Sequence, residues 1–130
     1  MGRNQTSAPS DWLAVAESDL RYAEAGFRAS GLAAPTCFIS QQVAEKALKA
    51  VLVARRGVVP RIHDLVKPLE LCVDEEPSLT NIAEDTKYLT RFYNEARYPS
   101  HLREDLTKKD AVGALEASHR VVAAVTKVLQ

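Results

Sequence analysis

The chain has 130 residues, enough for one domain with a buried core, and 46% of them are hydrophobic, as in ordinary globular proteins. Its 17 Lys and Arg residues balance its 17 Asp and Glu residues. This balance argues against a dedicated high-affinity nucleic-acid-binding domain, since such domains are usually basic. No apolar run approaches the length of a transmembrane helix and no secretory segment is recognisable, so we expect a cytoplasmic protein without membrane contact.

Residues 1–9 are polar and aperiodic, and we expect them to form a flexible tail before a single domain that spans residues 10–130. The first predicted helix carries one apolar stripe with alternating steps of three and four, formed by Leu13, Ala16, Leu20, Ala23 and Phe27. Ser10 is placed to cap the start of this helix, and Gly31 is placed to end it.

The second predicted helix opens with Pro35, a residue suited to a first helical turn, and runs to Gly57. Its apolar residues occupy more than one face. One row includes Leu48, and a separate row is formed by Ile39, Val43, Ala47, Ala50 and Ala54. A helix that is apolar on several sides is either central in its fold or contacts a second subunit, and on this ground we predict a two-fold dimer.

The second half of the chain also shows helical periodicity. A short third helix begins at residues 63–65, after a loop that contains Pro60. A long fourth helix, capped by Ser78, steps from residue 79 to residue 96 and ends near Arg97, because the following Tyr98 precedes a proline. Thr107 with Asp110 resembles a capping box and opens the last helix.

No segment shows the sustained alternation typical of a strand. We therefore predict an all-α fold: an antiparallel up-and-down four-helix bundle with an additional short helix. The side chains predicted to lie inside are Leu13, Leu20, Phe27, Leu48, Leu52, Ile82, Leu89, Leu115, Val122 and Val125.

Polar residues interrupt the apolar pattern of the second helix. Gln41 falls on a row that is otherwise apolar, and Gln42, Glu45 and Lys49 form the adjoining row. Polar groups at the edge of a core need hydrogen-bond partners, so these residues either join helices together or line a binding site. Basic residues also crowd this part of the chain, which leaves room for a local positive patch formed by Lys46, Lys49, Arg55, Arg56, Arg61 and Lys67.

Three further positions carry side chains that suit chemistry. His63, next to an acid at a helix start, can cap that helix or transfer a proton. Arg97 at a helix end is favoured by the helix dipole, and its forked donors also suit a phosphate. Trp12 is interpreted as a packing anchor. The two cysteines, Cys37 and Cys72, lack the spacing of metal ligands, and we predict neither a metal nor a cofactor.

The motifs together resemble one known family. Residues 41–50 read Gln-Gln-Val-Ala-Glu-Lys-Ala-Leu-Lys-Ala, His-Asp-Leu follows at 63–65, and Ala-Arg-Tyr-Pro follows at 96–99. This order of motifs, after an amphipathic first helix, resembles the HEPN domain family over residues 10–130. The resemblance implies a helical bundle that usually dimerises. It also implies a connection with nucleotides or RNA: many members are ribonucleases, often toxins of toxin–antitoxin pairs, and some are paired with a small nucleotidyltransferase.

The chain departs from the ribonuclease branch of the family at one motif. That branch has an arginine followed, after four to six residues, by a histidine. Here three residues separate Arg97 from His101, and one of them is Pro99. This departure argues against RNA cleavage. The expected fold, dimer and nucleotide-facing groove do not depend on this motif.

We therefore expect a dimeric, non-catalytic module that binds a nucleotide or phosphate through Gln42, Glu45, Lys49, His63 and Arg97, as the accessory partner of a small nucleotidyltransferase. One alternative is a metal-independent endoribonuclease of the toxin type, in which Arg97 stabilises the phosphate and His101 transfers a proton. Another alternative is a dimeric helical adaptor without a ligand.

Overall fold

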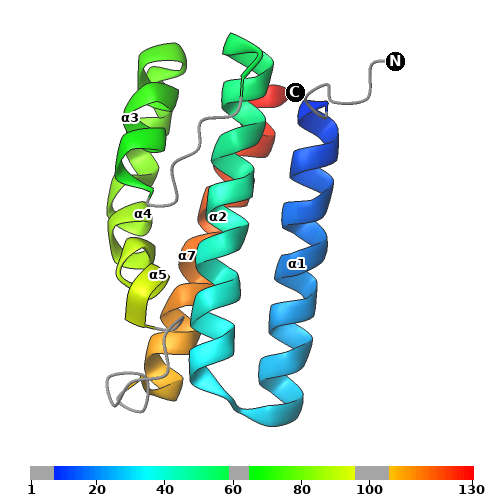
Figure 1. The fold of residues 1–130 in the computed structure, drawn as a ribbon, viewed down its shortest axis with the longest axis vertical. Coiled ribbons are helices and arrows are strands. Elements are labelled where there is room, and N and C mark those ends of the chain that lie inside the picture. The colour runs from blue at the N-terminus through cyan, green and yellow to red at the C-terminus, as the bar shows by residue number, and fades with distance from the viewer. Residues whose placement is uncertain (1–7, 59–64, 96–105) are drawn as a thin grey trace.

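The computed structural model describes residues 8–58, 65–95 and 106–130, and every regular element in these ranges is a helix (Figure 1). Three helices are long: α1 (Pro9–Ser30), α2 (Ala33–Arg56) and α7 (Lys108–Leu129). The shorter elements are α3 (Val66–Glu75), the 3₁₀ helix η1 (Pro77–Ile82), α4 (Ala83–Thr90) and α5 (Phe92–Glu95). Figure 1 shows α2 between α1 on one side and the column of α3, α4 and α5 on the other, with α7 behind it. The predicted all-α antiparallel bundle is confirmed.

Most helix ends follow their local signals, with corrections at the starts of α1 and α2; α2 begins at Ala33, two residues before the predicted Pro35. Gly31 and Gly57 end α1 and α2 in the left-handed region, with φ of 69° and 73°, as the sequence predicts. The predicted cap Ser10 is wrong, because α1 begins at Pro9 with Ala8 in the cap position. A proline at the first helical position lacks only an N–H that would have no partner there.

The opening of α7 is capped as predicted. The Thr107 hydroxyl accepts a hydrogen bond of 3.1 Å from the backbone N–H of Asp110. In return, the Asp110 carboxylate accepts one of 2.9 Å from the N–H of Thr107. Aspartate replaces the more usual glutamate in this capping box and still closes it, so two unpaired donors at the helix start are satisfied.

The long fourth helix predicted from residue 79 onward is not continuous. Its first part is η1, which Pro77 opens without a side-chain cap from Ser78, and a turn at Arg91 separates α4 from α5. Threonine side chains bond back to backbone carbonyls along this segment: Thr80 to Pro77, Thr86 to Ala83, and Thr90 to Thr86. Thr36 and Thr126 make the same kind of bond inside the unbroken helices α2 and α7, so these bonds accompany the break and do not explain it. The predicted end near Arg97 and the predicted start at His63 lie outside the described residues.

The core is centred on α2, which has buried side chains over more than half of its circumference. They are Thr36, Cys37, Ser40, Gln41, Val43, Ala44, Glu45, Ala47, Leu48, Ala50, Val51 and Leu52. Of the ten predicted interior residues, Leu13, Phe27 and Leu115 are only partly buried, which corrects the prediction for these three. They pack against the core from α1 and α7 and line hollows at the surface. Periodicity identifies the inward face of a helix but not the depth at which each residue lies.

The extra apolar row of α2 is covered within the chain at its three central positions. Val43, Ala47 and Ala50 have no exposed surface, because α2 packs against α1, α7 and α3, whereas Ile39 and Ala54 at the ends of the row stay partly exposed. The central part of the row therefore does not require a second subunit. A dimer remains a prediction that rests on family resemblance alone.

Both cysteines behave as core residues. Cys37 and Cys72 are fully buried, and the Cys72 thiol donates to the carbonyl of Leu48 over 3.4 Å. Burial raises the pKa of Cys72 to about 12, with a smaller upward contribution from Glu75 against a lowering by Arg56. The thiol therefore stays protonated and is a poor nucleophile. Within the described ranges, no helix is long and apolar enough to cross a membrane.

Candidate functional site

The polar residues of α2 form a chain of contacts along one side of the helix. The Gln42 amide donates to the side-chain oxygen of Gln41 over 2.7 Å, and the Gln41 amide lies 3.4 Å from Glu45 Oε1, which is long for a hydrogen bond. Lys49 Nζ donates to Glu45 Oε2 over 2.8 Å. The helical spacing predicted the row of Gln42, Glu45 and Lys49. In the structure Lys49 bonds directly to Glu45, whereas Gln42 connects to Glu45 through Gln41.

This network is largely withdrawn from solvent. Gln41 is fully buried, and the side chains of Glu45 and Lys49 are only 6% and 14% exposed. An ion pair in such a place loses hydration on both partners, and its geometry must be good to compensate for that loss. Both Glu45 oxygens meet a donor, so the carboxylate is well placed to hold the ammonium of Lys49 in one position.

Trp12 of α1 completes this cluster from the neighbouring helix. The ammonium of Lys49 lies 5.5 Å from the centre of the Trp12 ring, within the range of a cation–π interaction. The ring also packs against the core, as predicted for a packing anchor. Its buried Nε1 has no hydrogen-bond partner among the described residues. No spacing connects residue 12 with residue 49, so sequence patterns carry no signal for this contact.

The basic residues of this region do not form an open positive patch. Each of the five that the structure describes has an acidic partner: Lys46 with Asp19, Lys49 with Glu45, Arg55 with Glu76, Arg56 with Glu75, and Lys67 with Glu70. The sixth, Arg61, lies outside the described residues. The described cations are thus largely neutralised, which disfavours a broad surface for a polyanion.

Three predicted site residues cannot be placed relative to this network. His63, Arg97 and His101 lie outside the described residues, so the predicted convergence of His63 and Arg97 on Gln42, Glu45 and Lys49 stays a prediction. The described part of the site is the cluster of Trp12 with Gln41, Gln42, Glu45 and Lys49.

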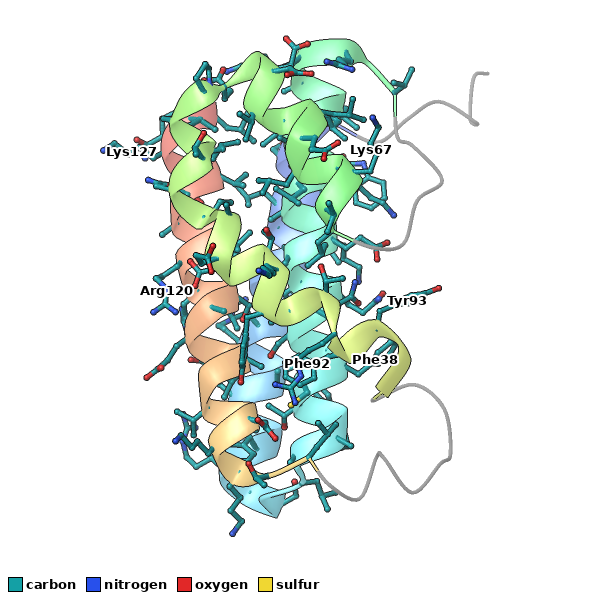
Figure 2. All side chains as sticks on the ribbon, turned by 90° about the vertical axis from the view of Figure 1, so that its left-hand side faces the viewer. Phe38, Lys67, Phe92, Tyr93, Arg120 and Lys127 are labelled. Atoms are coloured by element: carbon teal, nitrogen blue, oxygen red, sulfur yellow. The ribbon has the colours of Figure 1, made fainter. Side chains whose placement is uncertain are left out.

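A second cluster, which sequence reasoning did not find, joins α4 and α5 to α7. The guanidinium of Arg91 lies 4.8 Å from the ring centre of Phe92 and 3.8 Å from the Asp110 carboxylate. The Tyr88 hydroxyl donates to the carbonyl of Asp110, and burial raises the pKa of Tyr88, with a further upward contribution from Asp110. Figure 2 shows Phe92 within the bundle and Tyr93 reaching out to its side. These contacts between helices explain how α4 and α5 are fixed.

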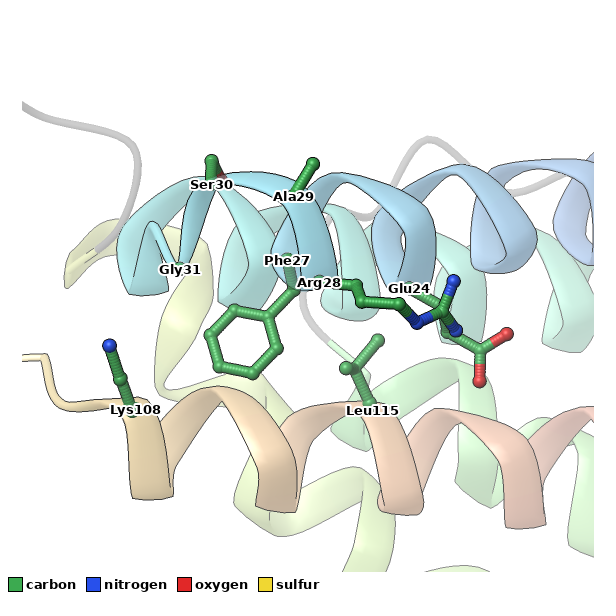
Figure 3. Close-up of a pocket in the computed structure, with 8 residues that line it drawn as sticks. All are labelled: Glu24, Phe27, Arg28, Ala29, Ser30, Gly31, Lys108 and Leu115. Atoms are coloured by element: carbon green, nitrogen blue, oxygen red, sulfur yellow. The ribbon is translucent and has the colours of Figure 1, made fainter.

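The ends of α1 and α7 enclose a separate hollow of about 620 Å³. Figure 3 shows Phe27 and Leu115 facing each other across it, with Lys108 at its edge. Of the predicted site residues that the structure describes, Gln42, Glu45 and Lys49, none lines this hollow. It is therefore distinct from the cluster around Lys49.

The order of the helices and the polar row of α2 agree with a comparison against known families. A model of the HEPN domain matches residues 9–128. The chain belongs to the HEPN domain family. The resemblance read from the motifs of α2 is thus confirmed over nearly the whole chain.

Two solved structures are similar to this HEPN domain. TT1696 from Thermus thermophilus is 31% identical, with a TM-score of 0.76 over 92% of this chain and 96% of that one. ST0689, described as an archaeal HEPN homologue, is 26% identical, with a TM-score of 0.75 over 96% of this chain and 100% of that one. A search of curated proteins gave no significant match.

Proposed function

We propose that this HEPN domain is a dimeric, non-catalytic module that binds a nucleotide or phosphate and serves as the accessory partner of a small nucleotidyltransferase. The observation that carries the proposal is that the Lys49 ammonium has unused hydrogen-bond donors. It has three N–H donors and a single acceptor, Glu45, among the described residues. The side chain is 14% exposed, so it is not fully closed off from solvent.

The surroundings of Lys49 favour a small anion. Glu45 and the Trp12 ring fix the ammonium, so a phosphate meets a cation that is already positioned and little further ordering is needed. The neighbouring Lys46 is neutralised by Asp19, so the positive charge does not extend into a track for a polynucleotide. A nucleotide with one phosphate group near Lys49 and Arg97 fits this arrangement better than a long RNA.

The two alternatives differ from the proposal in what they require. A toxin-type endoribonuclease requires Arg97 and His101 to act on one phosphate, despite the short spacing between them. A ligand-free adaptor requires the network from Gln41 to Lys49 to act only as a lock between α2 and its neighbours. The same set of variants separates all three functions.

The decisive experiment is a titration of ATP and GTP by calorimetry, with thermal unfolding measured on the same samples. We expect the wild type to bind, and we expect Lys49→Ala and Arg97→Ala each to weaken binding by about tenfold or more, since a charged hydrogen bond to phosphate is worth about 1.5–3 kcal/mol. Arg97→Ala should leave the melting temperature unchanged. Lys46→Ala is the matched control, one turn away in α2 and paired outside the network, and it should bind like the wild type.

Two outcomes of this experiment contradict the proposal. If no nucleotide binds at millimolar concentration and the variants only lower the melting temperature, the network is architectural and the adaptor is correct. If the wild type cleaves RNA without a metal and His101→Ala abolishes the cleavage, the domain is a nuclease. Under the proposal, His101→Ala leaves nucleotide binding intact.

We also infer that the domain is a homodimer in solution. The inference rests on the family, since Val43, Ala47 and Ala50 of α2 are covered within one chain. Light scattering at tens of micromolar protein should give about twice the chain mass of 14.3 kDa. A clean monomer mass at this concentration would exclude a stable dimer.

A further inference from the structure

Four side chains of different chemistry share one side of α2. Phe38, Gln42, Glu45 and Lys49 follow one another in steps of four, three and four, so they form one row along the helix, which we call the α2 row. The opposite side of α2 is closed by four residues without exposed surface: Ser40, Ala44, Ala47 and Val51. The α2 row therefore lies on the side of the helix that points away from this buried face. An aromatic ring, an amide, a carboxylate and an ammonium succeed one another along it.

The contacts from Glu45 through Gln41 fix which way the Gln42 amide is turned. A carboxylate only accepts hydrogen bonds, so Gln41 turns its amide nitrogen toward Glu45, where the two atoms lie 3.4 Å apart. The Gln41 oxygen then faces Gln42 and accepts from its amide nitrogen over 2.7 Å. The reverse orientation would place an oxygen against the carboxylate, and the two would repel each other. Gln42 is thereby held with its nitrogen toward Gln41.

Gln42 retains one acceptor and one donor that no described residue uses. Its Oε1 receives no hydrogen bond within the described ranges, and the second N–H of its amide has no acceptor there. Because two oxygens repel, Gln41 takes the N–H that points away from Oε1, so the unused oxygen and the unused N–H stay together on one edge of the amide. The side chain is half-buried and is not fully closed off from solvent.

The spacing along the α2 row suits a ligand with two different ends. Gln42 and Lys49 are seven residues apart, which is about two helical turns or about 10 Å along the axis. The bond from Lys49 to Glu45 brings the ammonium back over part of this length. Gln41 and Glu45 still lie between the two groups, so one phosphate group does not meet both. Phe38, one turn before Gln42 and partly buried against the core, adds an aromatic ring, and nucleic-acid bases stack on such rings.

We propose that Gln42 makes this site selective for an adenine nucleotide, with the base toward Phe38 and Gln42 and the phosphates toward Lys49. The inference rests on the proposed phosphate site at Lys49. Adenine has an N–H donor at N6 beside an acceptor at N7, which complements the unused edge of the Gln42 amide. The same edge of guanine has two acceptors, O6 and N7, and one of them would face the Gln42 oxygen.

Calorimetric titration of the full chain with four probes tests this selectivity. The probes are ATP, GTP, tripolyphosphate and purine riboside triphosphate, which is ATP without its amino group. The wild type should bind ATP about tenfold or more tightly than purine riboside triphosphate, because the Gln42 oxygen has no donor in the second complex. GTP should also bind about tenfold or more weakly than ATP. Tripolyphosphate should bind through Lys49 and show no dependence on Gln42.

The variant Gln42→Met removes the amide and keeps a side chain of similar length. Its affinity for ATP should fall about tenfold, to that for purine riboside triphosphate, while its affinity for tripolyphosphate stays at the wild-type value. Asn81→Leu is the matched control, since it removes an exposed amide from η1, and it should keep the wild-type ratio of the two nucleotide affinities. A merely structural role of Gln42 would leave this ratio unchanged. Circular dichroism establishes that both variants fold.

Three results overturn the inference: equal binding of ATP and purine riboside triphosphate by the wild type, tighter binding of GTP than of ATP, or a ratio that Gln42→Met does not alter. If tripolyphosphate binds in these cases and Lys49→Ala weakens its binding, the phosphate site of the proposed function stands without a base-selective Gln42. If no probe binds at millimolar concentration, both the proposed function and this inference fail.

Discussion

Leu48→Ala is expected to lower the free energy of unfolding by about 2–5 kcal/mol, the range for removal of a large aliphatic side chain from a packed core. Leu48 is fully buried in the middle of α2, the helix that packs against α1, α3 and α7. A void at this position therefore lies inside the packed core. Urea denaturation followed by circular dichroism measures the loss. The slope of the unfolding free energy against urea concentration should be the same in variant and wild type.

The matched control is Leu32→Ala. Leu32 is 59% exposed at the junction of α1 and α2, so the same chemical change there should alter the free energy of unfolding by only about 0.5 kcal/mol. Similar losses at both positions would show that Leu48 does not occupy a closely packed site. A loss at Leu48 below about 1 kcal/mol would have the same meaning.

Local chemistry makes much of the fold predictable. The left-handed glycines Gly31 and Gly57 and the capping box at Thr107 act through neighbours within a few residues, and all three are identifiable from sequence. The break of the fourth helix was not predicted, because apolar spacing continues through it. The hydroxyls of Thr80, Thr86 and Thr90 donate to backbone carbonyls there, but such bonds also occur in the unbroken α2 and α7, and nothing local in the sequence explains the break.

The site was predictable only where it lies on one helix. Spacing along α2 placed Gln42, Glu45 and Lys49 in one row, and they do form one network. The contribution of Trp12 depends on how α1 packs against α2, which no local pattern encodes. A dimer is hard to predict from α2 for a related reason: a sequence shows how many faces of a helix are apolar, but not which neighbour covers each face.

The pair of Glu45 and Lys49 provides the second large effect. Glu45→Gln should lower the free energy of unfolding by about 3 kcal/mol, the low end for removing one partner of a buried ion pair, because 14% of Lys49 stays exposed. The change keeps one oxygen to accept from Gln41 and replaces the oxygen that accepts from Lys49 with an NH2 group, so the ammonium loses both the charge and the acceptor that hold it. Lys49→Met leaves the Glu45 carboxylate without its cation and should cost a similar amount.

The double variant distinguishes a coupled pair from two independent residues. Because both charges are then absent together, Glu45→Gln with Lys49→Met should lose less stability than the sum of the single losses, by about 1–3 kcal/mol. The control is the pair of Asp19 on α1 and Lys46 on α2, where Lys46 lies about one turn from Lys49. Its side chains are about a third exposed, so Asp19→Asn and Lys46→Met should each cost about 1 kcal/mol or less. Strictly additive losses at Glu45 and Lys49 would mean that the carboxylate does not fix the ammonium. The positioned cation on which the proposed phosphate site depends would then be absent.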